Sequence, residues 1–287
     1  MDNVLNQAQI EECKSRFNLT YHVSYAAMCR KMAGFAGKDV LEVGGSLPPE
    51  FVFDYLKVRT WTAMETPEYD QALKETGGIT HKGTILGNEG MDYVPGADTI
   101  IKENYRFIYG NIEELSERLY EQFDLIFSIA TFEHIHKMPM ALEQMYNALK
   151  ADGKVFSMFS PVWSSFDGHH LPKITDIDGK SYNFGNSPIP AWGHLLMGPA
   201  EMYEYLCTKT DKVTAAHMAY YVYNSTHINR FFVEDYIRFF SLSPFTVETC
   251  NLTFPASMPP GMQKRLQELF PGKKHFAYNG ILVILKK

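Results

Sequence analysis

The stretch Asp39-Val40-Leu41-Glu42-Val43-Gly44-Gly45-Ser46-Leu47-Pro48 decides the fold of this 287-residue chain. Its apolar, β-favouring residues enclose one acid and lead directly into two glycines, which is typical of a buried parallel strand that ends at a tight turn. Because Gly44 and Gly45 have no Cβ, the backbone there can take positive φ or let a ligand approach closely. In open α/β sheets, ligands bind beyond the carboxyl ends of the strands, so this turn predicts a binding site.

The same stretch resembles the first motif of the class I S-adenosylmethionine (SAM)-dependent methyltransferases, which reads approximately (D/E)-x-G-x-G-x-G. Glu42, Gly44 and Ser46 occupy its first three fixed positions, although Ser46 replaces the second glycine and Pro48 the third. The resemblance implies that SAM contacts Glu42, Gly44, Gly45 and Ser46. The turn lacks the G-x-G-x-x-G pattern of dehydrogenases, and an acid there suits a cationic ligand better than a pyrophosphate.

A longer match follows further along the chain. The run from Phe123 to Ile135 resembles the family's fourth strand and the loop after it, and residues 123–161 match without a gap. The resemblance implies that Ile129 and Ala130 border the cofactor. Glu133 has two possible roles, either interacting with the amino end of the following helix or contacting the substrate.

Other cofactor contacts are predicted from spacing and from the resemblance. Glu65 ends the second predicted strand about 20 residues after the glycines, where nucleotide-binding sheets place the acid that binds ribose hydroxyls. Family members typically carry Gly-Asp where this chain has Gly110-Asn111, so Asn111 would accept from the adenine amino group without a charge. Ile112 would pack on the adenine, and Tyr21 would lie near the amino-acid part of SAM.

The fold predicted from these patterns is α/β, with a doubly wound, seven-stranded, mostly parallel sheet. Residues 1–20 form an N-terminal arm and residues 21–287 the methyltransferase domain, with insertions near 75–104 and 161–230 that form a cap or lid. The lid follows the fifth strand. The strands are expected at 40–43, 58–65, 105–109, 123–129, 155–160, 245–254 and 275–285, with helices at 21–35, 49–57, 138–149, 199–207, 233–240 and 262–270.

The lid supplies the candidate catalytic and substrate-binding residues. Methyl transfer usually requires removal of one proton from the acceptor, and histidine suits this task because its pKa lies near neutrality. His170 is the first candidate for the base, with His169 and His227 as alternatives. The candidate substrate contacts are Trp163, Asp167, Asn229 and Glu133. A divalent ion held by Asp167, His170 and His227 is a further, less favoured alternative, because no tight ligand spacing of the zinc type exists.

Composition limits the class of partner and the compartment. The net charge is −6 and no run of Lys or Arg stands out, which disfavours binding to nucleic acid. Four scattered cysteines without a CxxC pair indicate reduced thiols rather than a disulfide framework. There is no signal peptide pattern and no apolar run of membrane-spanning length, so we expect a cytoplasmic protein that does not bind membranes.

The sequence therefore predicts SAM-dependent methylation of a small molecule. The favoured reaction is O-methylation of a hydroxyl in a secondary-metabolite or sugar/glycan pathway. N-methylation and a non-catalytic SAM-fold binding module remain alternatives, and the protein is expected to be a monomer or a homodimer.

Overall fold

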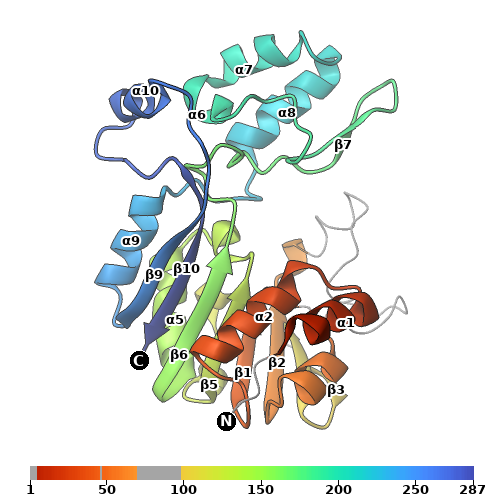
Figure 1. Ribbon diagram of the computed structural model, residues 1–287, viewed down its shortest axis with the longest axis vertical. Helices are drawn as coiled ribbons and strands as arrows, with labels where there is room; N and C mark the ends of the chain where they lie inside the picture. The colour runs from red at the N-terminus through yellow and green to blue at the C-terminus, as the bar shows by residue number, and fades with distance from the viewer. Residues whose placement is uncertain (1–4, 46, 70–97) are drawn as a thin grey trace.

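The computed structural model describes residues 5–45, 47–69 and 98–287, and consists of an α/β sheet region with a smaller cap above it (Figure 1). Ser46 and most of the insertion predicted near 75–104 lie outside the described residues.

The main sheet contains eight strands within the described residues, in the order β3-β4-β2-β1-β5-β6-β10-β9. The pairs from β4 to β6 are parallel, whereas β3 and β10 run against their neighbours. The seven predicted strands are all present, and the predicted fold is confirmed. The strands are β1 (Asp39–Val43), β2 (Thr60–Glu65), β3 (Asp98–Lys102), β4 (Tyr105–Tyr109), β5 (Phe123–Ile129), β6 (Leu149–Phe159), β9 (Thr246–Pro255) and β10 (Tyr278–Lys286).

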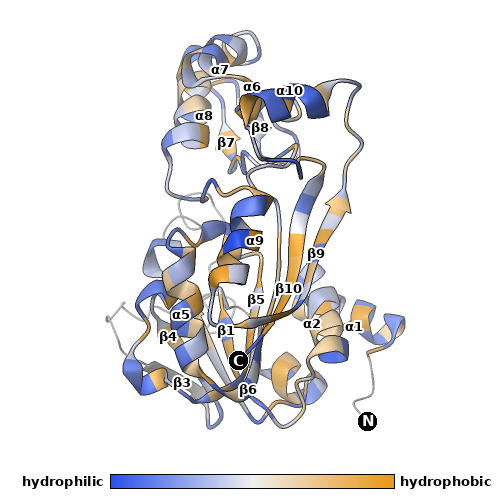
Figure 2. Cartoon of the chain, turned by 90° about the vertical axis from the view of Figure 1, so that its left-hand side faces the viewer, coloured by the Kyte–Doolittle hydropathy of each residue, from blue (hydrophilic) through white to orange (hydrophobic). Residues whose placement is uncertain are grey.

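Helices cover both faces of this sheet, and the alternation of side chains along each strand supplies a core to each face. Leu41 and Val43 pack on the side of α5 (Met138–Ala148) and α9 (Val233–Leu242). Val40 packs on the opposite side. That side is covered by α1 (Gln7–Phe17), α2 (Tyr21–Met32) and a π-helix, η1 (Phe51–Tyr55). The central strands are accordingly the most hydrophobic part of the chain (Figure 2).

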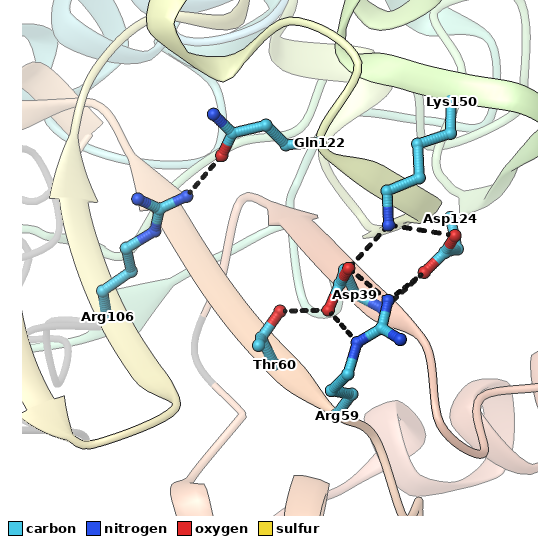
Figure 3. A network of polar contacts seen from close by, with 7 residues as sticks. All are labelled: Asp39, Arg59, Thr60, Arg106, Gln122, Asp124 and Lys150. Carbon is cyan, nitrogen blue, oxygen red and sulfur yellow. Dashed lines mark hydrogen bonds and ion pairs between the residues drawn. The ribbon is translucent and has the colours of Figure 1, made fainter.

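A network of charged side chains joins the amino ends of the central strands (Figure 3). It lies at the opposite end of these strands from the edge where the cofactor is expected. Arg59 Nε donates to Asp39 Oδ1 at 2.7 Å, and Thr60 Oγ1 donates to the same oxygen at 2.9 Å. Lys150 Nζ bridges Asp39 Oδ2 at 2.6 Å and Asp124 Oδ1 at 3.2 Å. The network therefore fixes the register of four strands at one end and leaves their carboxyl ends for binding.

The cap has a hydrophobic core of its own, which includes Trp163, Trp192 and Leu266. It is built from a two-stranded sheet and four helices: β7 (Ile174–Thr175), β8 (Ser181–Tyr182), α6 (Gly193–Leu196), α7 (Pro199–Leu206), α8 (Lys212–Asn224) and α10 (Met262–Leu269). The segment containing α10 lies between β9 and β10, so two separate parts of the chain build the cap (Figure 1).

Short 3-10 helices follow two of the strands at the cofactor edge: η2 (Ile112–Glu114) after β4 and η4 (Phe132–His134) after β5. A third, η3 (Glu117–Leu119), precedes β5. In the part of the chain that the structure describes, no helix is long and apolar enough to cross a membrane.

Candidate active site

A cavity of about 810 Å³ lies beyond the carboxyl ends of β1, β2, β4 and β5, beneath the cap. The sheet edge forms the wall where a nucleoside is expected, and the end of α8 forms the opposite wall. Of the residues predicted from sequence, those that line the cavity are Tyr21, Gly44, Glu65, Asn111, Ile112, Ile129, Ala130 and His227. The structure therefore brings these eight residues to one cavity.

The glycine turn brings the end of β1 against the loop after β5. Gly44 has φ +76°, and a Cβ on it would lie 2.0 Å from Thr131 Oγ1. Only glycine therefore fits without movement of Thr131. The N–H groups of Gly44 and Gly45 both donate to Met64 O, at 2.9 and 3.1 Å, which ties the turn to the end of β2.

Glu42 lies behind this turn, and it is absent from the described cavity lining, in contrast to the predicted direct contact with SAM. Its Oε2 accepts from Trp61 Nε1 at 2.9 Å and from Leu47 N at 3.3 Å. A Cβ on Gly45 would lie 2.9 Å from the same oxygen, so Gly45 too faces Glu42. In this structure, the acid of the motif supports the loop from within the sheet.

Glu65 and Asn111 occupy the edge next to this turn. Glu65 is 6% exposed and its Oε1 accepts from Thr66 N at 2.7 Å, which orients the carboxylate at the cavity wall. Asn111 Oδ1 accepts from Glu113 N at 2.9 Å and caps η2. The amide oxygen that was predicted to accept from adenine is thus already an acceptor for the backbone.

Histidines gather at the cap side of the cavity. His134 and His227 line it, and their ring centroids lie 4.8 Å apart. His134 Nδ1 donates to His227 O at 2.5 Å, so the hydrogen is on Nδ1 and Nε2 carries the lone pair. Tyr69 stacks on His227, with centroids 5.8 Å apart and an interplanar angle of 8°. The centroid of the His170 ring lies 5.1 Å from that of His134 and 5.6 Å from that of His227. His170 is not among the described lining residues.

Burial keeps these imidazoles neutral. Desolvation lowers the pKa of His134 to about 3, helped by the neighbouring His227, and lowers the pKa of His227 to about 4. Desolvation and the nearby histidines also hold the pKa of His170 well below its usual value. Each ring therefore offers a lone pair rather than a positive charge at neutral pH.

Glu133 precedes this cluster and is almost completely buried. Neither of its carboxylate oxygens has a hydrogen-bond partner of ordinary geometry among the described residues. Burial raises its pKa to about 8, while the backbone N–H groups of Glu133 and Ser160 oppose the rise. The carboxyl group is thus largely protonated at neutral pH, and it is absent from the described cavity lining.

The other candidates from the lid lie away from the cavity. His169 Nδ1 accepts from Leu171 N at 3.1 Å, and Trp163 belongs to the cap core. Asp167 accepts from Ser165 Oγ at 3.1 Å. The sequence placed these residues near the methyl group because their loop begins at a strand end, but the loop turns into the cap.

Asn229 also has a structural position. Its Nδ2 donates to Phe132 O and to Ile135 O, both at 2.8 Å, so it fixes the loop that carries His134. From sequence, the Glu133-His134 pair was interpreted as structural in preference to catalytic, and Tyr69 and Tyr220 were not singled out, although His134, Tyr69 and Tyr220 all line the cavity. The adjacency of His134 to the predicted fourth strand was the one feature that pointed to it.

Comparison with known proteins finds one family model that matches part of this chain. Residues 98–183, from β3 to β8, match a family model described as a methyltransferase domain. This part of the chain is therefore similar to a methyltransferase domain. No curated protein matches the sequence.

Solved structures that resemble this chain are distant in sequence. A putative SAM-dependent methyltransferase from Listeria monocytogenes is 13% identical with a TM-score of 0.47, covering 93% of this chain and 97% of its own. One from Mesorhizobium loti is 11% identical with a TM-score of 0.46, covering 94% and 100%. Geranyl diphosphate C-methyltransferase from Streptomyces coelicolor A3(2) is 9% identical with a TM-score of 0.47, covering 99% and 87%.

The cavity edge presents groups that suit SAM. Glu65 presents an acid at the end of β2, where a carboxylate can accept from two vicinal hydroxyls. Ile112 presents an apolar surface, and the backbone at Gly44 reaches the cavity without a side chain. The sheet edge therefore offers a hydrogen-bond acceptor and an apolar surface of the kind that a nucleoside needs.

Proposed function

We propose that this methyltransferase transfers the methyl group of SAM to a hydroxyl oxygen of a small molecule. The observation that carries the proposal is a single cavity that reaches from Glu65 at the sheet edge to His134 and His227 beside the cap. Its volume of about 810 Å³ lies within the usual range for small-molecule sites, roughly 300–1,000 Å³. One end suits a nucleoside, and the other suits an acceptor that must lose a proton.

At the cofactor end, Glu65 accepts from the ribose hydroxyls and Ile112 packs on the base. Gly44 allows the backbone to approach the ligand, and Tyr21 borders the same end from the first turn of α2. When bound, SAM supplies a methyl group on a sulfonium, so the new carbon–oxygen bond forms as the carbon–sulfur bond breaks and S-adenosylhomocysteine leaves. The chain must align the acceptor oxygen in line with that bond.

At the acceptor end, an imidazole takes the proton that the hydroxyl loses. The His134 ring is oriented by its Nδ1–H bond to His227 O, which leaves Nε2 as the proton acceptor. His227 borders the same space. His170, the first candidate from sequence, packs behind these two rings and positions them.

The acceptor is a small hydroxylated molecule of the secondary-metabolite or sugar class. Tyr69 and Tyr220 offer aromatic faces beside the histidines, and Asn224 and Thr226 add polar groups. Aromatic walls with a few placed polar groups are typical of sites that orient a small ligand.

Calorimetry with SAM and S-adenosylhomocysteine tests the cofactor end. Glu65→Gln keeps the shape of the side chain but removes its charge, so we expect SAM affinity to fall about 10- to 100-fold. Glu117→Gln, on the exposed first residue of η3, is the matched control and should bind as the wild type does. Equal affinities of wild type and Glu65→Gln would contradict the cofactor placement.

Release of S-adenosylhomocysteine tests the acceptor. A panel of small alcohols, sugars and phenols is compared with matched amines at saturating SAM, and the products are identified by mass spectrometry. We expect product from hydroxylated compounds. If only the amines are methylated, the proposed reaction is wrong and the protein is an N-methyltransferase.

A further inference from the structure

Three histidines that are distant in sequence meet at the cap side of the cavity. His134 ends η4, His170 lies in the first cap loop, and His227 follows α8. One ring nitrogen of each lies within 4.8 Å of the other two. Among the described residues, no other group of three His, Cys, Asp or Glu side chains comes together in this way.

The hydrogen bonding of His134 is that of a metal ligand. Its Nδ1–H donates to the backbone carbonyl of His227, which leaves Nε2 directed away from that bond. Metal-binding histidines almost always donate their second ring N–H to a carbonyl, a carboxylate or water, because this fixes the tautomer and the ring orientation.

His170 has an unsatisfied ring nitrogen. Its Nδ1 is buried and has no hydrogen-bond partner among the described residues. Burial of such a nitrogen without a partner is destabilising. The residue also has φ +48°, in the left-handed region where histidine is found more often than most other residues. A ligand at this place would satisfy the buried, desolvated imidazole nitrogen.

We propose that His134, His170 and His227 bind one divalent transition-metal ion, with Zn²⁺ as the best fit. Imidazole suits Zn²⁺ and its neighbours in the first transition row, whereas Mg²⁺ and Ca²⁺ require oxygen ligands. Three protein ligands with one open position are the arrangement of catalytic zinc sites. Zn–N bonds of about 2.0–2.1 Å place tetrahedral nitrogens about 3.3 Å apart, so ring nitrogens that lie within 4.8 Å of one another would have to approach by no more than about 1.5 Å to close the site.

The site corrects the metal hypothesis from sequence. His170 and His227 meet as expected, but His134 takes the place given to Asp167, whose carboxylate accepts from Ser165 in the same loop. Spacing along the chain could not indicate this set, because the three residues come together only when the cap folds over η4.

The use of the ion rests on the proposed function, whereas binding of the ion does not. Since His134 and His227 line the cavity, the open position faces the acceptor. Zinc lowers the pKa of a bound water to about 7, and a hydroxyl at the same position would lose its proton more easily for the same reason. The imidazoles would then be ligands, and the proton would pass to solvent.

The test uses the full chain without a polyhistidine tag, stripped of metal with a chelator and titrated with Zn²⁺ and with Co²⁺. We expect one equivalent to bind, and X-ray absorption of the Zn²⁺-loaded protein should show about three imidazole nitrogens near 2.0 Å. His170→Ala should weaken binding by more than about tenfold, because even loss of an outer-shell partner costs about 10- to 100-fold. His217→Ala removes an exposed imidazole on α8 and should leave binding unchanged.

Wild type that takes up no ion, or His134→Ala and His170→Ala variants that bind as tightly as wild type, would overturn the site. If circular dichroism shows that these variants do not fold, the X-ray absorption spectrum of the Zn²⁺-loaded wild type is the test. A coordination shell without imidazole nitrogens would overturn the site equally. Calorimetry with SAM on the same samples separates the two proposals. Turnover that survives chelation without any bound ion removes the role of the ion in the reaction and leaves the methyltransferase, whereas ion binding without SAM binding keeps the metal site and removes the methyltransferase.

Discussion

Gly44 meets two separate requirements at the end of β1. Its φ of +76° favours glycine for backbone reasons, and the contact with Thr131 excludes a side chain for steric reasons. Gly37 meets only the first, because it has φ +70° and nothing lies within 4 Å of a Cβ built there. Alanine substitutions at the two glycines therefore separate the cost of the steric contact with Thr131 from the cost of the backbone conformation.

Gly44→Ala should destabilise the protein and weaken SAM binding, whereas Gly37→Ala should only destabilise it slightly. A left-handed alanine costs about 1–2 kcal/mol at either position. At Gly44, overpacking against Thr131 adds about 1–3 kcal/mol. Thermal unfolding and SAM calorimetry on both variants check this, and Thr131→Ala in the Gly44→Ala background should recover part of the loss. Equal unfolding temperatures for the two variants would show that Thr131 moves aside freely.

Single residues of the cofactor edge were predictable because their positions follow from local rules. Glu65 was found by its distance from the glycines, and the structure places it on the cavity wall. Glu42 was assigned to SAM on the motif alone, although its indole partner Trp61 could not be foreseen. The position of His134 after the fourth predicted strand is compatible with a packed histidine as well as a functional one, because its partners His170 and His227 lie in the cap.

At the scale of elements, the amino end of β1 depends on the charge of Asp39. Its side chain is 17% exposed, and hydrogen bonds from Arg59, Lys150 and Thr60 hold the pKa of the carboxyl far below its usual value, with Arg59 as the largest cause. A carboxyl whose pKa is lower in the folded state stabilises the fold above its unfolded pKa, which is about 3.9. That contribution is lost progressively as the pH falls below about 4.

Asp39→Asn should therefore lower the stability of the protein at pH 7 by roughly 1–2 kcal/mol, because Arg59 is 57% exposed and solvent screens part of the interaction. The gap between wild type and variant should narrow as the pH falls from 4 towards 3. Thermal unfolding across this range measures it, with Asp54→Asn, an exposed acid in η1, as the control. A gap that is constant with pH would mean that the charge of Asp39 contributes nothing.

The elements that the sequence predicted best are those with strong periodicity and a clear end. Helix α5 and strands β1, β2, β4 and β5 lie at the predicted positions, because buried apolar runs bounded by glycine or acid have few alternatives. β6 begins at Leu149, directly after α5, although the strand was predicted only from Val155. Asp152 has φ +61° and lies at an irregularity within the strand, between the expected helix and the expected strand.

Other differences arise where pairing or packing overrides local preference. β3 lies in a segment predicted to be irregular and gains its strand structure by antiparallel pairing with β4. Residues 49–57 were predicted as an ordinary helix, but η1 is wound as a π-helix with Phe51 and Val52 fully buried against α1 and α2. Neither pairing nor burial can be deduced from a single segment.

At the scale of the whole molecule, the chain has two hydrophobic regions, and both contribute to the cavity. The sheet region contributes the edge proposed for the cofactor, and the cap contributes Tyr220 and His227 on the side proposed for the acceptor. The insertion after the fifth strand was predicted, but the part of the cap built by α10 was not. Its amphipathic pattern suits packing on either region, and only the fold shows that Leu266 enters the cap core.

Two matched truncations test whether the cap opens independently of the sheet. Leu266→Ala in α10 and Leu142→Ala in α5 each remove the same atoms from a fully buried position, at about 2–5 kcal/mol. If the regions are separate cooperative units, Leu266→Ala should raise hydrogen exchange in α7, α8 and α10 and reduce methyl transfer more than SAM affinity. Leu142→Ala should raise exchange in α5 and the neighbouring strands, and should weaken SAM binding. Hydrogen exchange followed by mass spectrometry, with calorimetry on both variants, measures this. An equal rise of exchange in cap and sheet after Leu266→Ala would mean that they unfold as one unit, and the acceptor side could then not open while the cofactor edge stays folded.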